Sequence, residues 1–488
     1  MGLNLALNIA SKGFRISVAN RSPNRVDTAV QEAEAQGLSE NVVPFKDDLA
    51  GFVKSIQKPR AIIILVNAGA AVDSTIQALR VHLEEGDIII DGGNEWWENT
   101  ERRSKELAEY GLQYLGMGVS GGEVGARYGP SLMPGGPKAA YLKVEDVMLA
   151  ISAKSPQGEP CVTYIGPGGS GNYVKMVHNG IEYGDMQLIA EAYDLLKHVG
   201  GLSNEELAAT FAEWNQSELQ SYLIEITSKI FAVKDESKEN YVVDVILDKT
   251  GMKGTGTWTV RDAAQQGVAV PTIAAALTAR QMSALLEERK AASHILKGPQ
   301  GDVVNGDAES ANQILCELVS RGLLPGAVDT GLDRAAFALM VRDALYAAKI
   351  CSYAQGMALI KATGEANEWD LNLGEIARIW KAGCIIRARF LGDITKAFLR
   401  NPLLPNLMVD EFFAHELNAR QQSLRALTAA AALLGVSVPA FSSSLAYYDA
   451  YRRARLPANL TQAQRDFFGA HTYERVDQPG SFHTEWNK

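Results

Sequence analysis

The chemistry-bearing side chains of this sequence gather in the segment from Gly169 to Gly184. Lys175, His178, Asn179 and Glu182 recur at i, i+3, i+4 and i+7, so they share one stripe of a predicted helix. A lysine can act as a base and a glutamate as an acid, which suits proton transfer at neighbouring carbons of a small substrate. The rest of the segment is apolar, which favours a buried helix whose polar stripe needs partners or a ligand. A solvated polar face is the alternative.

Three glycine-rich turns are candidate anion sites. Ser120-Gly121-Gly122 and Asp91-Gly-Gly-Asn94 each follow a predicted strand, where α/β sheets bind their ligands, and Lys253-Gly-Thr-Gly is the third turn. Glycines allow backbone N–H groups to approach an anion closely. Each turn is weak evidence by itself, because glycine-rich turns are common.

The elements that must position these residues change character along the chain. In the first third, apolar strands alternate with helices and predict a Rossmann-like, doubly wound parallel sheet. The strands are expected at 15–19, 61–66, 87–90 and 112–116, and two of the intervening helices at 72–84 and 98–110. Later patterns are almost wholly helical, at 172–199, 204–230, 271–296, 334–362 and 373–391.

We therefore predict an α/β domain over 1–170, a large all-helical domain over 171–450 and a carboxyl-terminal tail over 451–488. The segment 301–332 is rich in glycine and aspartate, and we expect an exposed excursion between helices, with a solvated loop as the simplest form. The tail loses helical periodicity after Phe468, so we expect it to fray unless it docks on another surface.

The amino end departs from the usual dinucleotide-binding order of strand, glycine-rich turn and helix. A helical pattern begins at once, and only Gly2 can represent the last fingerprint glycine. We expect the first strand to be missing and the sequence to be truncated; a plain surface helix is the alternative. Asn20-Arg21-Ser22 follows the next strand, where an arginine accommodates the 2′-phosphate of NADP. An ordinary solvated turn explains these three residues equally well.

Composition narrows the class of protein. The 488 residues carry 47 Lys plus Arg and 57 Asp plus Glu, a net charge of −10, which argues against non-specific nucleic-acid or anionic-membrane binding. The four cysteines form no C-x-x-C pair, and the seven histidines are scattered, so no metal is expected. The most apolar stretch, 426–438, is shorter than the roughly 20 residues that span a bilayer. We expect a cytoplasmic protein, with the plastid as the alternative.

Several long motifs resemble the decarboxylating 6-phosphogluconate dehydrogenase family. They are Val119–Gly136, Val174–Gln187, Lys253–Gly256, Cys384–Arg387, Leu456–Leu460 and Gln462–Glu474. Trp96, 163–166 and 481–486 resemble the plant or algal branch. The resemblance implies an oxidoreductase of the pentose phosphate pathway (pentose shunt, gluconate utilisation). It would oxidise and decarboxylate 6-phosphogluconate with NADP, giving ribulose 5-phosphate, CO2 and NADPH.

The resemblance also implies residue roles, with Lys175 as the catalytic base and Glu182 as the acid. The sugar acid would contact Asn94, Ser120, Gly121, Gly122, His178 and Asn179. The phosphate would contact Tyr183, Lys253, Thr255 and Arg280, and Arg465 and His471 would reach in from the partner's tail in a homodimer. The cofactor would contact Gly2, Asn20, Arg21, Ser22, Val66, Asn67, Ala68 and Asn94. Asn67 stands where the family usually has lysine.

Two other functions compete with this interpretation. A related 3-hydroxyacid dehydrogenase would keep the Lys175 helix but would not need Lys253, Arg280 and Arg465 together. An inactive homologue that serves as a binding subunit would explain the incomplete cofactor fingerprint, but not the intact stripe. Binding of 6-phosphogluconate without NADP would favour the inactive homologue.

Overall fold

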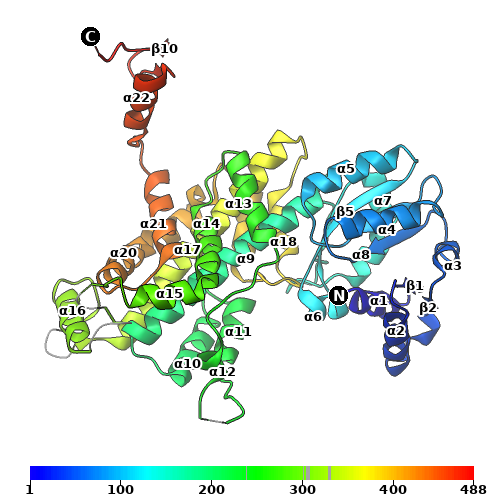
Figure 1. Cartoon of the computed structure of the whole chain (residues 1–488), viewed down its shortest axis with the longest axis horizontal. Helices are drawn as coiled ribbons and strands as arrows, with labels where there is room; N and C mark the ends of the chain where they lie inside the picture. The colour runs from blue at the N-terminus through cyan, green and yellow to red at the C-terminus, as the bar shows by residue number, and fades with distance from the viewer. Residues whose placement is uncertain (238, 300–301, 304–307, 328–330, 488) are drawn as a thin grey trace.

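The computed structural model describes residues 1–237, 239–299, 302–303, 308–327 and 331–487. An α/β lobe from the first third of the chain lies beside a larger helical lobe, and the carboxyl-terminal tail stands clear of both (Figure 1). This arrangement confirms the predicted fold class of a Rossmann-like domain followed by an all-helical domain.

The strands of the α/β lobe form two separate sheets. In the first, β1 (Ile16–Ala19) pairs in parallel with β2 (Val42–Phe45). The second has the order β3-β4-β5-β6, with β3 (Ala61–Ile64), β4 (Ile88–Asp91), β5 (Gln113–Ser120) and β6 (Ser131–Gly135). The four predicted strands are confirmed, whereas β2 and β6 were not predicted. The predicted strands at β3, β4 and β5 pair in parallel as expected, whereas the additional strand β6 returns antiparallel to β5.

Helices cover these sheets on both sides. They are α1 (Gly2–Ser11), α2 (Pro23–Ala35), α3 (Leu49–Lys54), α4 (Ala70–Arg80), α5 (Trp97–Ala108), α6 (Gly122–Tyr128), α7 (Lys138–Leu142) and α8 (Glu145–Ile151). Leu5 and Ile9 of α1 share a buried apolar cluster with Ile88 and Ile90 of β4. The first helix is therefore part of the core rather than a plain surface helix.

The helical lobe contains α9 (Ser170–Asp194), η2 (Leu195–Val199), α14 (Pro271–Ala284), α17 (Arg334–Ala366) and α20 (Glu411–Leu433), among others. Two of its predicted helices were wrong in extent. The segment 204–230 is two helices, α10 (Asn204–Trp214) and α11 (Tyr222–Phe231), because a Ser203 capping box begins one and the Ser221 side chain caps the next. The segment 373–391 contains only α18 (Leu373–Ile379), followed by a turn that leads into α19 (Phe390–Arg400).

Two other segments also differ from the expectation. The pattern at 271–296 divides at Leu285 into α14 and α15 (Leu286–Ser293). The expected loop at 301–332 includes a helix, α16 (Ala308–Ser320), whose Leu318 and Val319 are buried in the main core. Parts of that prediction, at 301, 304–307 and 328–330, lie outside the described residues.

The long helices α9 and α17 cross at the centre of the helical lobe, where glycines permit close approach. A Cβ on Gly356 would lie 2.4 Å from the Ile181 side chain, and one on Gly184 would lie 2.3 Å from the Ser352 hydroxyl. Helix α9 is thereby enclosed, which supplies the buried environment that its polar stripe needs. Within the described ranges, no helix is long and apolar enough to cross a membrane.

The tail has its own folded end. After α21 (Pro439–Tyr451) come α22 (Ala458–Gly469), β9 (Tyr473–Glu474) and β10 (Ser481–Phe482), which form a small hairpin beside α22. The buried Asp466 carboxylate accepts four hydrogen bonds, from Thr472 N, His483 Nδ1, Thr484 N and Trp486 Nε1, at 2.8–3.0 Å. Helix α22 thus ends at Gly469, where the periodicity ends, and the residues after it are held against the helix by Asp466.

Candidate active site

Glycines bring the first turns of α9 directly against the end of the sheet. A Cβ on Gly171 would lie 2.3 Å from the carbonyl oxygens of Gly116 and Met133, and one on Gly118 would lie 2.4 Å from Cβ of Lys175. Any side chain at these positions would push the helix away from the sheet. The close contact places Lys175 beside Ser120, the last residue of β5.

Lys175, His178 and Asn179 of the predicted stripe on α9 form one hydrogen-bonded group with Ser120, whereas Glu182 Oε2 lies 3.9 Å from His178 Nδ1, beyond hydrogen-bond distance. Lys175 Nζ donates to Ser120 Oγ at 3.1 Å and to Asn179 Oδ1 at 2.9 Å. Asn179 Oδ1 lies 3.0 Å from His178 Nδ1, and Ser120 Oγ lies 3.4 Å from His178 Nε2. Because an amide oxygen only accepts, Nδ1 carries the proton, and Nε2 of the neutral ring is free to accept from the Ser120 hydroxyl. The alternative of a solvated polar face is therefore wrong.

Burial sets the charges of this group. It lowers the pKa of Lys175, although the nearby Glu182 partly opposes the shift. It raises the pKa of Glu182 despite the opposing influence of Lys175 and Arg280. Burial, and then Lys175, hold the pKa of His178 well below its ordinary value. These directions favour a neutral lysine and a protonated glutamic acid, the forms that a base and an acid require.

A loop of the helical lobe covers the site from the far side. A Cβ on Gly121, whose φ is +108°, would lie 2.5 Å from the Gly383 carbonyl, which accepts from Ser131 N at 2.9 Å. Trp380 of this loop packs edge-on against His178, with ring centroids 5.4 Å apart. Sequence reasoning gave Trp380 and Gly383 no role, although the neighbouring Cys384–Arg387 motif marks their position.

The residues expected to hold a phosphate gather around Tyr183, which lies about one turn after Asn179 on α9. The Arg280 guanidinium lies 3.5 Å from the centroid of the Tyr183 ring. Helix α13 (Thr255–Gln265) begins beside the same ring, since a Cβ on Gly256 would lie 2.4 Å from it. The structure thus brings Tyr183, Thr255 and Arg280 together, and Lys253 precedes them on an exposed turn.

Apart from Gly2 at the start of α1, the residues expected to hold the cofactor follow the carboxyl ends of β1, β3 and β4, and β1 belongs to the separate two-stranded sheet. Asn20, Arg21 and Ser22 follow β1, Val66, Asn67 and Ala68 follow β3, and Asn94 follows β4. Asn20 Oδ1 accepts from Ser22 N at 2.9 Å, which forms a tight turn that leaves Arg21 exposed. A Cβ on Gly93 would lie 3.3 Å from the Val66 carbonyl, and one on Gly2 would lie 3.7 Å from Leu65. An exposed arginine and exposed loop residues after these strands fit an NADP molecule.

Two predicted residues lie away from this site. Arg465 and His471 belong to the tail, which projects from the helical lobe (Figure 1). Arg465 bonds Gln462 at 3.0 Å within the same helix. Phe467, Phe468 and Trp486 of the tail are exposed aromatic side chains. A single chain therefore leaves this part of the predicted site incomplete.

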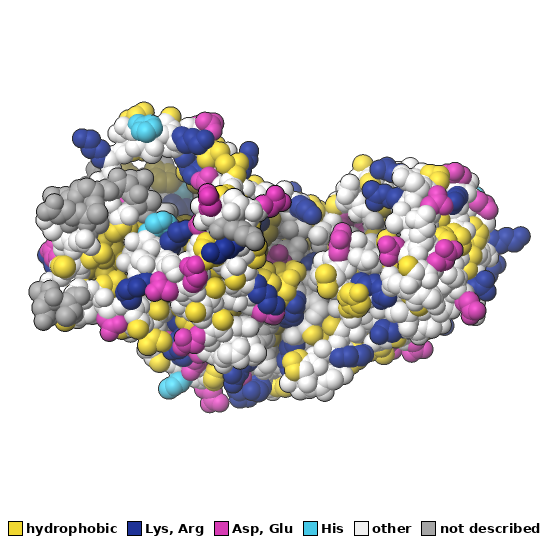
Figure 2. Space-filling model, turned by 90° about the horizontal axis from the view of Figure 1, so that it is seen from below, with side chains coloured by type: hydrophobic (Ala, Val, Ile, Leu, Met, Phe, Trp, Pro, Cys, Tyr) yellow, Lys and Arg dark blue, Asp and Glu magenta, His cyan; other side chains and the backbone are white. Residues whose placement is uncertain are grey.

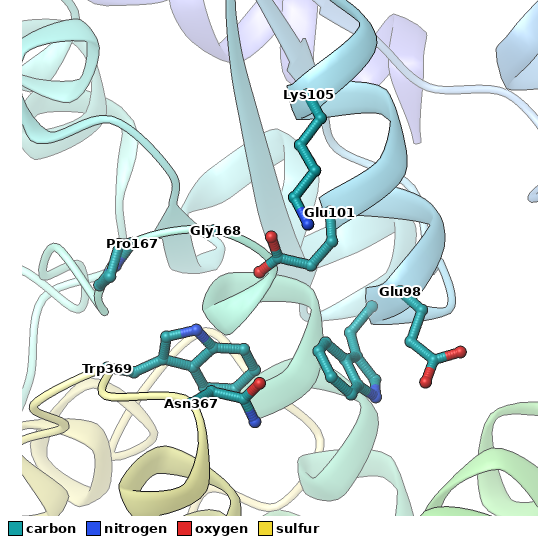
Figure 3. A pocket seen from close by; sticks show the side chains of 8 residues that line it. Glu98, Glu101, Lys105, Pro167, Gly168, Asn367 and Trp369 are labelled. Carbon is teal, nitrogen blue, oxygen red and sulfur yellow. The ribbon is translucent and has the colours of Figure 1, made fainter.

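A separate pocket of about 470 Å³ lies between α5 and the segment before α9 (Figure 3). It is lined by Trp97, Glu98, Glu101, Lys105, Pro167, Gly168, Asn367 and Trp369, and it includes none of the predicted site residues. Glu101 accepts from Gly169 N at 2.7 Å and so supports the start of α9. In the part of the chain that the structure describes, no group of three or more His, Cys, Asp or Glu side chains is placed to hold a metal ion.

Comparison with known proteins gives consistent matches along the whole chain. The model of the NAD binding domain of 6-phosphogluconate dehydrogenase matches residues 1–166, and that of the 6-phosphogluconate dehydrogenase C-terminal domain matches residues 171–486. The chain is 59% identical over 488 residues to 6-phosphogluconate dehydrogenase, decarboxylating 1, of Oryza sativa subsp. japonica, covering 100% of this chain and 96% of the rice protein.

Two further relatives extend this similarity. The chain is 57% identical over 496 residues to 6-phosphogluconate dehydrogenase, decarboxylating 3, chloroplastic, of Arabidopsis thaliana, covering 100% of this chain and 96% of that protein. A solved structure of Plasmodium falciparum 6-phosphogluconate dehydrogenase superposes with a TM-score of 0.90 at 47% identity, covering 100% of this chain and 98% of that chain. That protein was solved in its apo form, with its cofactor NADP+ and with its substrate 6-phosphogluconate.

Proposed function

The chain belongs to the 6-phosphogluconate dehydrogenase family, and we propose that the stripe on α9 performs the proton transfers of its reaction. The reaction is the NADP-dependent oxidative decarboxylation of 6-phosphogluconate to ribulose 5-phosphate, CO2 and NADPH. The observation that supports the proposal is the burial of Lys175 between Ser120 and Asn179, with a lowered pKa.

Lys175 acts first, as the base. Its neutral amine takes the proton of the substrate 3-hydroxyl while a hydride leaves C3, and the substrate becomes a 3-keto acid. Bound NADP supplies the hydride acceptor. Burial favours the neutral amine, which has a lone pair for this proton. Ser120 and Asn179, which hydrogen-bond Nζ, orient the amine toward the hydroxyl.

The same lysine, now an ammonium, assists the loss of CO2. The bond between C1 and C2 breaks, and its electron pair moves toward the C3 carbonyl oxygen as the carboxylate leaves. Lys175 stabilises the charge that develops on that oxygen. Glu182 then gives its proton to the carbon that becomes C1 of ribulose 5-phosphate, and the raised pKa of its carboxyl keeps that proton available.

Other residues hold the substrate in place. We assign the sugar-acid end to Asn94, Ser120, Gly121, Gly122, His178 and Asn179, and the phosphate end to Tyr183, Lys253, Thr255 and Arg280. Two cations and the amino end of α13 suit a dianionic phosphate, because charge-assisted hydrogen bonds are stronger than neutral ones. This local basicity explains how an acidic chain can bind an anionic substrate.

The cofactor contacts follow the exposed edge of the α/β lobe. We assign the 2′-phosphate of NADP to the Arg21 guanidinium and the Ser22 hydroxyl, and the rest of the dinucleotide to Gly2, Val66, Asn67, Ala68 and Asn94. Replacement of Arg21 by alanine should weaken NADP binding about tenfold or more and leave NAD binding nearly unchanged. Equal losses for both cofactors would remove this assignment.

The tail completes the phosphate site of a second copy. We divide the chain into domains at 1–170 and 171–450 and a tail at 451–488, and we assign Arg465 and His471 to the partner's site in a homodimer. The projection of the tail and its exposed aromatic side chains support this arrangement. Light scattering during size-exclusion chromatography tests it: a species of twice 52.8 kDa is expected, and a monomer at assay concentration would contradict it.

We propose the cytoplasm as the compartment, with the plastid as the alternative. The Arabidopsis relative described above carries the word chloroplastic in its name, whereas the rice relative described above names no compartment. Microscopy of the fluorescently tagged natural protein in its own cells separates the two locations: a diffuse cytoplasmic signal is expected, and a plastid signal would contradict the proposal.

The function is tested by following products and cofactor together. Purified protein with 6-phosphogluconate and NADP should form NADPH, measured at 340 nm, CO2 and ribulose 5-phosphate in equal amounts. NADPH without CO2, or equal turnover of a non-phosphorylated 3-hydroxy acid, would identify the related dehydrogenase instead. Binding of 6-phosphogluconate without NADP binding or turnover would identify an inactive homologue.

A further inference from the structure

A buried ion pair joins Glu95, in the loop after β4, to Arg103 on α5. Both side chains also hydrogen-bond Gly69, in the turn after β3. Both side chains are 1% exposed, and Arg103 NH1 lies 2.6 Å from Glu95 Oε2. Arg103 also donates from Nε to Asp73 Oδ1 at 2.7 Å and from NH2 to the Gly69 carbonyl at 3.0 Å. The guanidinium therefore contacts three segments at once, namely the turn after β3, helix α4 and the loop after β4.

The Glu95 carboxylate is surrounded by hydrogen-bond donors. Oε2 accepts from Gly69 N at 2.9 Å in addition to Arg103, and Oε1 accepts from Trp96 N at 2.8 Å and Asn99 Nδ2 at 3.0 Å. These four partners are all N–H donors, so the site requires a group with two acceptor oxygens. Although burial acts to raise the pKa of Glu95, the hydrogen bonds from Asn99, Gly69 and Arg103 lower it.

A second carboxylate fixes the start of the same loop. Asp91 at the end of β4 accepts from Tyr114 OH and from Gly93 N, each at 3.0 Å, and its Oδ2 lies 3.7 Å from Arg103 NH1. The loop from Asp91 to Glu95 is thus held at both ends. Asn94, between these anchors, is exposed.

The position of this ion pair gives it a function beyond folding. Gly69 directly follows Val66, Asn67 and Ala68, and Glu95 directly follows Asn94. The first loop is assigned above to the cofactor, and Asn94 to both ligands. A loop that is already ordered loses less conformational freedom when its ligand binds, which strengthens binding.

We propose that Glu95 and Arg103 are positioning residues that hold the cofactor loop and the Asn94 loop as one unit, so that losing the ion pair weakens the binding of NADP and of 6-phosphogluconate together. The inference rests on the proposed function, since it presumes that these loops bind those ligands.

Two variants of the full-length dimer test the ion pair. Glu95→Gln keeps the size of the side chain but turns an NH2 group toward N–H donors. Arg103→Lys keeps the charge but removes the planar fork that reaches three partners. The dissociation constants for NADP and for 6-phosphogluconate, measured separately by calorimetry, should each rise about tenfold in both variants.

The matched control is Arg102→Lys, one residue away. Arg102 is exposed and pairs with Asp73 and Glu106 on the surface. Its replacement should change either dissociation constant by less than about twofold, because exposed pairs contribute little. A third variant, Asn99→Ala, removes only one donor to Glu95 and keeps the test available if a stronger variant fails to fold. It should raise both constants about two- to threefold.

Circular dichroism and melting temperature show which variants are folded. A folded variant in which both constants stay within twofold of the wild type would overturn the inference, and so would a change confined to one ligand. A purely structural role would lower the melting temperature and leave the affinities of the folded protein unchanged. If the wild type binds neither ligand, the proposed function itself fails.

Discussion

The stripe on α9 and the phosphate-binding region differ in how much of each one chain supplies. Lys175, His178 and Asn179 are buried and hydrogen-bonded to groups of the same chain. Lys253 is exposed on a turn, and Arg465 lies on the projecting tail. Folding of one chain therefore organises the residues that we assign to proton transfer, whereas in the proposed homodimer the tail of a second copy completes the phosphate contacts.

The difference follows from what each task requires. A lysine becomes a useful base only when burial lowers its pKa, so the proton-transfer residues must lie inside the protein. A phosphate dianion is bound by long cationic side chains, which do not need shifted pKa values and can remain on the surface until substrate and partner arrive. Over the face seen in Figure 2, positive and negative side chains are interspersed rather than gathered on one lobe.

The largest effect is expected from Lys175→Met, which removes the proposed base from the stripe on α9. The maximal rate of NADPH formation should fall about 10³- to 10⁴-fold, because positioned acid–base groups contribute on that order. Binding of 6-phosphogluconate, measured by calorimetry, should change far less than the rate. A variant rate within tenfold of the wild type would show that another group removes the proton.

Glu182→Gln should reduce the maximal rate about 10²-fold by removing the acid. The wild-type rate should fall at low pH as Lys175 becomes protonated, and fall at high pH as Glu182 loses its proton. Because the pKa of Lys175 is lowered and that of Glu182 is raised, both limbs should lie closer to neutrality than the ordinary values of these groups. The variant should lose the high-pH limb, and an unchanged profile would reject the role of Glu182.

Arg280→Ala tests the phosphate-binding region. Loss of one charge-assisted contact should raise KM for 6-phosphogluconate about 10- to 100-fold, with the maximal rate changed far less. Turnover of gluconate, which lacks the phosphate, serves as the control and should be unaffected. An equal loss for both substrates would mean that Arg280 supports the proton-transfer residues instead.

The smallest effect is expected from Asp466→Asn in the tail. The asparagine turns an NH2 group toward N–H donors and loosens the turn that carries His471, so KM for 6-phosphogluconate should rise about three- to tenfold. Asp477→Asn is the control, because Asp477 pairs with Arg475 on the tail surface. Similar effects of the two variants would indicate a general response of the tail to lost charge.

The stripe on α9 could be predicted from the sequence, because the spacing of its polar residues is a local pattern. Polar residues at helical spacing within an apolar segment identify one face of one helix. In the structure, Lys175 and His178 of that face both hydrogen-bond Asn179. The strand ends that carry Ser120 and Asn94 were likewise predicted from the alternation of strands and helices. Resemblance then supplied the roles that spacing alone leaves open.

What the sequence did not predict depends on contacts between distant segments. Trp380 and Gly383 reach the site because glycines allow close backbone contact at Gly121, which no periodic pattern records. Helical periodicity at 373–391 continues through a turn that tertiary packing imposes. Glu95 and Arg103 resemble ordinary surface charges of a helix start, and only the fold shows that they are buried together.

The contrast between the two regions is tested most directly by mixing two weak variants. Lys175→Met chains lack the base but keep the tail, whereas Arg465→Ala chains keep the base but lack the tail cation. If the tail acts on the partner, each mixed dimer has one complete site, and an equal, fully exchanged mixture should recover about a quarter of the wild-type activity at limiting 6-phosphogluconate. Activity no higher than the average of the two separate variants would show that the tail serves its own chain, and would contradict the account.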